Sequence, residues 1–152
     1  MKLSKLFVIA LLVGTMGLIV GCGSDNPDSW NELDQALGDD PTNGCDPSSD
    51  AYTDLRGQSS VTITDIDAWE VPHNACIGVS SGTEIIWQGD FDAHPLVGGV
   101  SPTTDSGSPI TQEMASGTDD ATVTLNATEL TVYPYFCEIH TTNMGGVIAV
   151  FP

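Results

Sequence analysis

The stretch of sequence that decides the fold is YPYFCEIHTTNMGGV, residues 133–147. Its first residues belong to a β-branched and aromatic run, Leu130–Phe136, that is typical of a strand, and its Gly-Gly pair leads into a second apolar run. Cys137, His140 and Met144 lie between the two runs, within eight residues of one another. Such a loop can present a thiolate, an imidazole and a thioether to one point. The stretch therefore predicts two strands joined by a metal-binding loop.

The sequence on both sides of this loop, within residues 57–152, predicts further strands. Short β-branched and aromatic runs alternate with clusters of Gly, Pro, Asp and Ser, which is typical of an antiparallel sandwich or barrel. Residues 95–117 are mostly turn-forming, and we expect loops with one weak strand there. About 95 residues is a normal size for one such domain. The predicted strands are residues 60–66, 75–79, 84–88, 121–125, 130–136 and 147–151.

A second imidazole comes from His94, which follows a predicted strand in the segment GDFDAHPL, residues 89–96. Two histidines, one cysteine and a weakly bound methionine form the ligand set of a blue-copper site. The soft thiolate and thioether suit Cu(I), whereas the imidazoles are adequate for Cu(II). The sequence therefore predicts one copper ion bound by His94, Cys137, His140 and Met144.

Three of the four predicted ligands also have a simpler interpretation. Cys137 is alternatively a buried structural cysteine, His94 an ordinary loop histidine, and Met144 a side chain that fills the core. His94 is preferred to His73 because it follows a predicted strand. Structural zinc bound by the cysteine, two histidines and an acid is a further alternative, although Met144 has no role in it.

Several other classes of site are not expected. A Cys-x-x-Cys-His haem motif, a second cysteine in the ligand loop and a Ser-His-Asp motif in a recognisable context are missing from the sequence. The chain has three histidines in total, too few for a multicopper oxidase. We therefore do not expect an enzyme.

Three segments carry a family resemblance: GTEIIW at residues 82–87, HPL at 94–96 and YFCEIHTTNMGGVIAV at 135–150. Together they resemble the plastocyanin/azurin family of cupredoxins over residues 57–152. The resemblance implies a Greek-key β-sandwich, the same four copper ligands, and an electron that leaves through the exposed edge of His140. The chain departs from the family's pattern in its Cys-x₂-His-x₃-Met spacing and in Pro95 after the first histidine.

The cysteines outside the ligand loop predict a disulfide. In an oxidising compartment, unpaired thiols are usually bridged or bound to metal. Cys137 has a histidine three residues later, whereas Cys45 and Cys76 have no histidine on their C-terminal side at ligand spacing. We therefore predict a Cys45–Cys76 disulfide. The alternative is a second metal site made by Cys76 and His73.

Residues 1–21 resemble the secretory signal of a bacterial lipoprotein. Two lysines precede an apolar stretch that ends in small residues, a pattern typical of a signal peptide rather than a membrane span. In lipoproteins the cysteine that follows, here Cys22, becomes the lipidated N-terminus. The alternative is a signal anchor with a chance cysteine. We expect an extracytoplasmic, lipid-anchored monomer on the periplasmic side of a membrane, and Gly23 points weakly to the outer membrane.

Residues 22–56 are predicted to be an acidic, disordered linker, because they are rich in Asp, Pro, Ser, Asn and Gly. Residues 28–37 are the exception. Their apolar residues fall at helical spacing, and Ser29 with Glu32 matches a capping box. This pattern predicts a short helix that either docks on the domain or serves as a spacer.

The negative charge of the chain limits the classes of partner that it can bind. Beyond the signal, Arg56 is the one Lys or Arg residue, against all 21 acidic residues. Such a surface repels nucleic acid and anionic headgroups, so we expect membrane contact through the lipid anchor only. The acidity either maintains solubility in a salty habitat or steers the protein toward a basic patch on a redox partner.

The function predicted from these features is single-electron transfer between extracytoplasmic redox proteins by one type 1 copper. The alternative is a lipoprotein that holds or delivers copper without a redox circuit. Copper-handling proteins often contain Met- or His-rich tracts, and this sequence has neither. The composition therefore favours the electron carrier.

Overall fold

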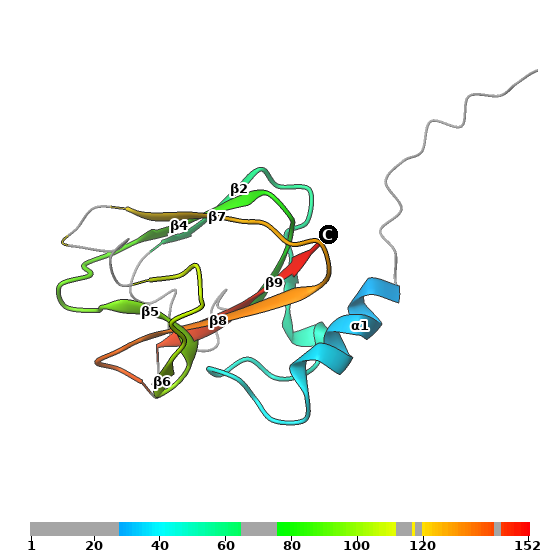
Figure 1. Ribbon diagram of the computed structural model, residues 1–152, viewed down its shortest axis with the longest axis horizontal. Helices are drawn as coiled ribbons and strands as arrows, with labels where there is room; N and C mark the ends of the chain where they lie inside the picture. The colour runs from blue at the N-terminus through cyan, green and yellow to red at the C-terminus, as the bar shows by residue number, and fades with distance from the viewer. Residues whose placement is uncertain (1–27, 65–75, 112–116, 118–119, 142–143) are drawn as a thin grey trace, which may run out of the picture.

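The computed structural model describes residues 28–64, 76–111, 117, 120–141 and 144–152 (Figure 1). The predicted signal peptide, Cys22 and His73 lie outside the described residues. No helix in the described part is long and apolar enough to cross a membrane. The elements are α1 (Asp28–Leu37), a 3-10 turn η1 (Ser49–Ala51), β1 (Thr53–Asp54), β2 (Ser60–Thr64), β3 (Cys76–Ser80), β4 (Thr83–Gln88), β5 (Leu96–Val100), β6 (Thr103–Thr104), β7 (Ala121–Leu125), β8 (Thr131–Cys137) and β9 (Gly145–Phe151).

The strands form two mixed sheets, which Figure 1 shows as two layers. The larger sheet has the order β1-β3-β9-β8-β5-β6, and the smaller has the order β2-β4-β7. Strand β8 is antiparallel to both β5 and β9, and β4 is antiparallel to β7. The predicted all-β domain is confirmed. The expectation of purely antiparallel sheets is wrong, because β1–β3, β3–β9 and β2–β4 are parallel pairs.

The parallel pairs arise where the chain changes sheets. Strands β3 and β4 are joined by a tight turn, yet they belong to different sheets. In that turn the N–H of Ser81 donates to Phe151 of the larger sheet, and the N–H of Gly82 donates to Leu125 of the smaller sheet. Gly82 has a φ of 88°, a conformation that favours glycine. The turn therefore moves the chain from one layer to the other instead of forming a hairpin.

The main hydrophobic core lies between the two sheets. In β4 the buried residues Thr83, Ile85 and Trp87 alternate with partly exposed ones, which places one face of the strand against the core. The rings of Trp87 and Tyr135, from opposite sheets, meet edge to face with centroids 5.4 Å apart. The same cluster includes Cys137 and Met144. Both ends of the predicted ligand loop are therefore anchored in the core.

A second cluster covers the outer face of the larger sheet. Every residue of β9 is buried, because Ile148 and Val150 face the main core while Val147, Ala149 and Phe151 face residues of the N-terminal segment. The predicted helix is present as α1, and its Leu33 is fully buried in this cluster. The described part of the predicted linker, residues 28–56, is thus packed on the sheet rather than extended from it.

The disulfide predicted between Cys45 and Cys76 is present and joins this N-terminal segment to the start of β3. A second attachment is made by Arg56, whose guanidinium lies 4.9 Å from the ring centroids of both Trp30 and Phe151. Arg56 also forms an ion pair with Asp54 at 2.7 Å. The single basic residue beyond the predicted signal therefore contributes to packing at the end of the domain where β9 terminates.

Candidate metal centre

Sheet pairing brings Cys137 and His94 together. Cys137 is the last residue of β8 and pairs with Leu96 of β5, two residues after His94. The turn before β5 is closed by Asp90, whose carbonyl accepts the N–H of His94 at 2.9 Å and whose carboxylate accepts the N–H of Ala93 at 3.2 Å. This local turn fixes the backbone that carries the His94 side chain.

The loop after β8 brings His140 to the same place. The N–H of Met144 donates to the carbonyl of His140 at 3.1 Å, and the N–H of Cys137 donates to the carbonyl of Met144 at 2.9 Å. These two bonds close the loop from Cys137 to Met144 on itself. The side chain of Cys137 is fully buried, His94 is half-buried and His140 is exposed.

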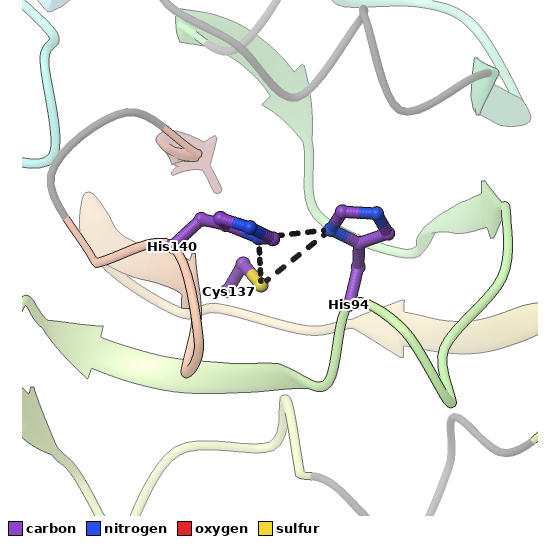
Figure 2. Close-up of side chains that lie close together, drawn as sticks. All are labelled: His94, Cys137 and His140. Atoms are coloured by element: carbon purple, nitrogen blue, oxygen red, sulfur yellow. Dashed lines mark hydrogen bonds between the residues drawn. The ribbon is translucent and has the colours of Figure 1, made fainter.

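The three side chains converge on one point, as Figure 2 shows. The Nδ1 atoms of His94 and His140 are 3.1 Å apart. Cys137 Sγ lies 3.9 Å from Nδ1 of His94 and 3.6 Å from Nδ1 of His140. In this triangle the point equidistant from all three atoms lies about 2.1 Å from each, within the range of metal–nitrogen and metal–sulfur bonds. The three side chains could therefore hold a metal ion between them.

The chemistry of the donors agrees with this geometry. A thiolate and two neutral imidazoles are the metal-binding forms of these side chains. Residues 57–152 contain no Lys or Arg. The charge that offsets a buried thiolate at Cys137 would therefore come from the imidazoles or from a bound cation. Thiolate with imidazole suits zinc and copper better than calcium or magnesium, which prefer oxygen ligands.

Met144, the fourth predicted ligand, is buried in the same core cluster as Cys137. It also borders a surface hollow of about 360 Å³. The lining of this hollow includes Phe136 of β8, Thr141 of the ligand loop, and Pro41 and Asn43 of the N-terminal segment. Met144 therefore lies in the same core cluster as Cys137, at the end of the ligand loop.

The surroundings of the three ligands are acidic and partly apolar. Asp90, Asp92 and Glu138 are exposed, as expected for solvated surface acids. Ile139, between two predicted ligands, exposes 60% of its surface, and it is one of two large hydrophobic residues exposed in the described part of the chain. The exposed histidine of the site therefore lies beside an exposed apolar residue.

Sequence reasoning missed Asn43 and Ser101, which border the same loop. Asn43 belongs to a Thr-Asn-Gly sequence that indicates a turn, and its φ is 46°. Its side chain forms hydrogen bonds with residues of β5 and β8. The turn could be found from the sequence, but the direction of the side chain depends on how the N-terminal segment packs.

Comparison with known proteins does not assign the chain to a family. No protein-family model matches it, and no curated protein matches its sequence. The identification of a candidate metal centre therefore depends on His94, Cys137 and His140 themselves and on the distances between their ligand atoms.

Proposed function

We propose that the protein is an electron carrier that uses one type 1 copper ion, similar to the plastocyanin/azurin cupredoxins. The observation that carries this proposal is the triangle formed by Cys137 Sγ and the Nδ1 atoms of His94 and His140. A thiolate with two imidazoles is the core of a blue-copper site, to which a methionine is a weak, long axial ligand. His94, Cys137 and His140 would hold the ion, with Met144 as the axial ligand.

The fold supports the same proposal. Two sheets enclose one core, and the ligand loop connects β8 and β9 of the larger sheet. We assign this arrangement to the Greek-key sandwich of the cupredoxins. Cys137 ends β8 and His94 directly precedes its antiparallel neighbour β5, so strand pairing contributes to setting the distance between the two ligand segments. Ligands on rigid elements are held more accurately than ligands on free loops.

Bound copper would supply a couple between Cu(I) and Cu(II). The residues of this chain would limit the rearrangement that accompanies each change of charge, because strand pairing and backbone hydrogen bonds hold Cys137 and the loop that follows it. The burial of Cys137 keeps water and oxidants from the thiolate. The exposed His140 connects the site to the surface, and we assign it as the point where electrons enter and leave.

The same proposal covers location and partners. We propose a monomer, anchored through a lipid on Cys22 outside the cytoplasm, that exchanges electrons with redox proteins carrying a basic docking patch. The acidic side chains around the site, Asp90, Asp92 and Glu138, match such a patch in charge. No substrate turnover is proposed.

The test is the visible and electron paramagnetic resonance spectrum of the full chain after one equivalent of Cu(II) is added. We expect an intense visible band with narrow copper hyperfine splitting, bleached by a mild reductant and restored by an oxidant. His94→Gln should abolish the band, whereas His73→Gln is the matched control and should leave it unchanged. Cys137→Ser should remove the colour while the far-ultraviolet circular dichroism stays that of the parent.

Other outcomes would contradict the proposal in different ways. A pale spectrum typical of nitrogen and oxygen ligands would show that Cys137 does not bind copper. Stoichiometric copper binding without reversible reduction would favour a copper-handling protein. Retention of zinc against a large excess of copper would identify a structural zinc site.

A further inference from the structure

We propose that Asn43 is a positioning residue for the metal centre and that it holds the ligand loop through the N-terminal segment. This inference rests on the proposed metal centre, but it concerns residues that are not themselves proposed metal ligands. It follows from the hydrogen bonds of one side-chain amide and from the way these bonds reach both ends of the loop Cys137–Met144.

Asn43 lies in a turn that is fixed at its base. The backbone groups of Thr42 and Cys45 form two reciprocal hydrogen bonds of 2.9 and 2.8 Å. Asn43 and Gly44 between them have φ values of 46° and 82°, the combination of a type I′ turn, for which Asn-Gly is the preferred pair. Cys45 is bonded to Cys76 of β3. The turn is therefore a rigid support attached to the larger sheet by a covalent bond.

The Asn43 amide bridges strands at the point where their pairing ends. Nδ2 donates to the carbonyls of Gly99 in β5 and Tyr135 in β8 at 2.9 and 2.8 Å, and Oδ1 accepts the N–H of Ser101 at 2.8 Å. The β5–β8 ladder stops at the pair of Gly98 and Tyr135, so Tyr135 lies at its end and Gly99 and Ser101 lie just beyond it. The side chain thus replaces the backbone hydrogen bonds that a longer ladder would have supplied.

From these strands the contacts reach both ends of the ligand loop. Tyr135 lies two residues before Cys137 on β8. On the other side, the hydroxyl of Ser101 donates to the carbonyl of Thr141, the residue that follows His140. A Cβ placed on Gly145, directly after Met144, would lie 3.1 Å from the Cβ of Asn43. Asn43 therefore contacts the chain just before Cys137 and just after Met144, and it reaches the residue after His140 through Ser101.

Two variants separate the amide from the turn. Asn43→Gly keeps the positive φ at no steric cost and removes the amide, whereas Asn43→Asp keeps the acceptor for Ser101 but removes both donated bonds. Leu33→Ala is the control, because it weakens the packing of α1 in the second cluster, which includes none of the described residues of the loop Cys137–Met144. All are made in the full chain with Cys22→Ser, so that Cys137 is the one thiol outside the disulfide.

The first measurement needs no metal. In metal-free protein we expect the thiol of Cys137 to react with an aromatic disulfide about tenfold faster in Asn43→Gly than in the parent, the size expected for lost hydrogen bonds of ordinary strength. Asn43→Asp should also react faster. Leu33→Ala should change the thiol rate only in proportion to its population of unfolded protein. Should Asn43→Gly fail to fold, Ser101→Ala removes only the bond to Thr141 and should show the same direction of change.

The second measurement separates this inference from the proposed function. With Cu(II) added, Asn43→Gly should shift the hyperfine splitting and the reduction potential, and Leu33→Ala should shift neither. If the parent gives the blue-copper spectrum but both Asn43 variants match it in thiol rate and potential, the positioning role is overturned and the proposed function stands. If the parent binds no copper while the thiol rates change as expected, the proposed function fails and the hold of Asn43 on the loop is supported.

Discussion

The carbonyl of Pro95 accepts a hydrogen bond of 2.9 Å from the N–H of Glu138. Each of these residues directly follows a ligand of the candidate site, Pro95 after His94 and Glu138 after Cys137. The bond therefore joins the two ligand segments next to the side chains of Cys137 and His94, whose Sγ and Nδ1 atoms are 3.9 Å apart. Because it involves only backbone groups, it holds these segments independently of the Glu138 side chain.

Glu138→Pro should disturb this connection without changing any ligand. Proline lacks the N–H, so the bond to Pro95 is lost, and we expect weaker metal binding and a broadened copper spectrum. Glu138→Ala keeps the N–H and removes the exposed carboxylate, so it should retain the parent spectrum. Titration with copper, followed by electron paramagnetic resonance, measures both variants. Equal spectra for the two would show that the backbone bond does not hold the site.

Tyr135→Phe should leave stability nearly unchanged at neutral pH. The buried Tyr135 hydroxyl has no hydrogen-bond partner among the described residues. The ring of Trp87 packs against the Tyr135 ring, but its indole N–H likewise has no partner of good geometry in the described part of the chain. Removing an unpartnered hydroxyl therefore alters the free energy of unfolding by less than about 1 kcal/mol. Thermal unfolding at pH 7 measures this difference. A large loss would reveal a partner for the hydroxyl.

The same variant should differ from the parent in alkaline solution. Burial raises the pKa of Tyr135 far above its ordinary value, with a smaller opposite effect from Trp87. The unfolded chain ionises near pH 10, so the parent loses about 1.4 kcal/mol per pH unit above that value until the folded pKa is reached. Tyr135→Phe removes this loss. Chemical unfolding from pH 9 to 11 checks it, with the less buried Tyr133→Phe as the control.

Asp54→Asn should lower stability at neutral pH but not in strong acid. Hydrogen bonds from the Arg56 side chain hold the pKa of Asp54 below its usual range, although burial opposes this shift. The stabilisation is therefore present above the ordinary pKa of about 3.9 and is lost as the pH falls through the lower folded value. For this partly exposed pair we expect less than about 1 kcal/mol. Urea unfolding at pH 7 and pH 2, with Asp39→Asn as the control, measures the difference.

Gly78→Ala should separate α1 from the larger sheet. A Cβ at Gly78 would lie 2.6 Å from the Trp30 ring and 3.0 Å from the Phe151 ring. We expect a loss of about 1–3 kcal/mol from this overpacking. In a Trp30→Ala background the same substitution should cost less, and a double-mutant cycle measures the coupling. Gly107→Ala, in an exposed loop, should have almost no effect. Additive losses would mean that Trp30 does not pack on Gly78.

Part of this fold could be predicted because it is encoded locally. The β-branched runs became strands, and the spacing of Cys137 and His140 indicated that both residues lie in one loop. The disulfide followed from the lack of a histidine after Cys45 and Cys76. The helix was indicated by apolar spacing within ten residues. Each of these signals lies within a short stretch of chain, so no knowledge of distant contacts was needed.

The remaining features depend on distant contacts. Strand β5, in a region predicted to be mostly loop, contains Gly98 and Gly99, which weaken a strand signal. The structure requires both: a Cβ on Gly98 would overlap Ser108, and Gly99 has a φ of 132°. Parallel pairing and the bonds of Asn43 likewise join residues far apart in sequence. Local periodicity carries no information about which distant strand or carbonyl a residue will meet.

The packing of Trp30 on Phe151 places α1 at one end of the domain. In this contact α1 meets Phe151, the last residue of β9, whereas the ligand loop joins β9 at its first residue, Gly145. A strand of this length spans about 20 Å, so α1 and the candidate metal centre lie toward opposite ends of the larger sheet (Figure 1). A molecule held by residues before Asp28 would therefore point His140 away from its attachment. On a crowded surface, neighbouring copies would lie side by side with their candidate metal centres accessible to proteins that diffuse from solution.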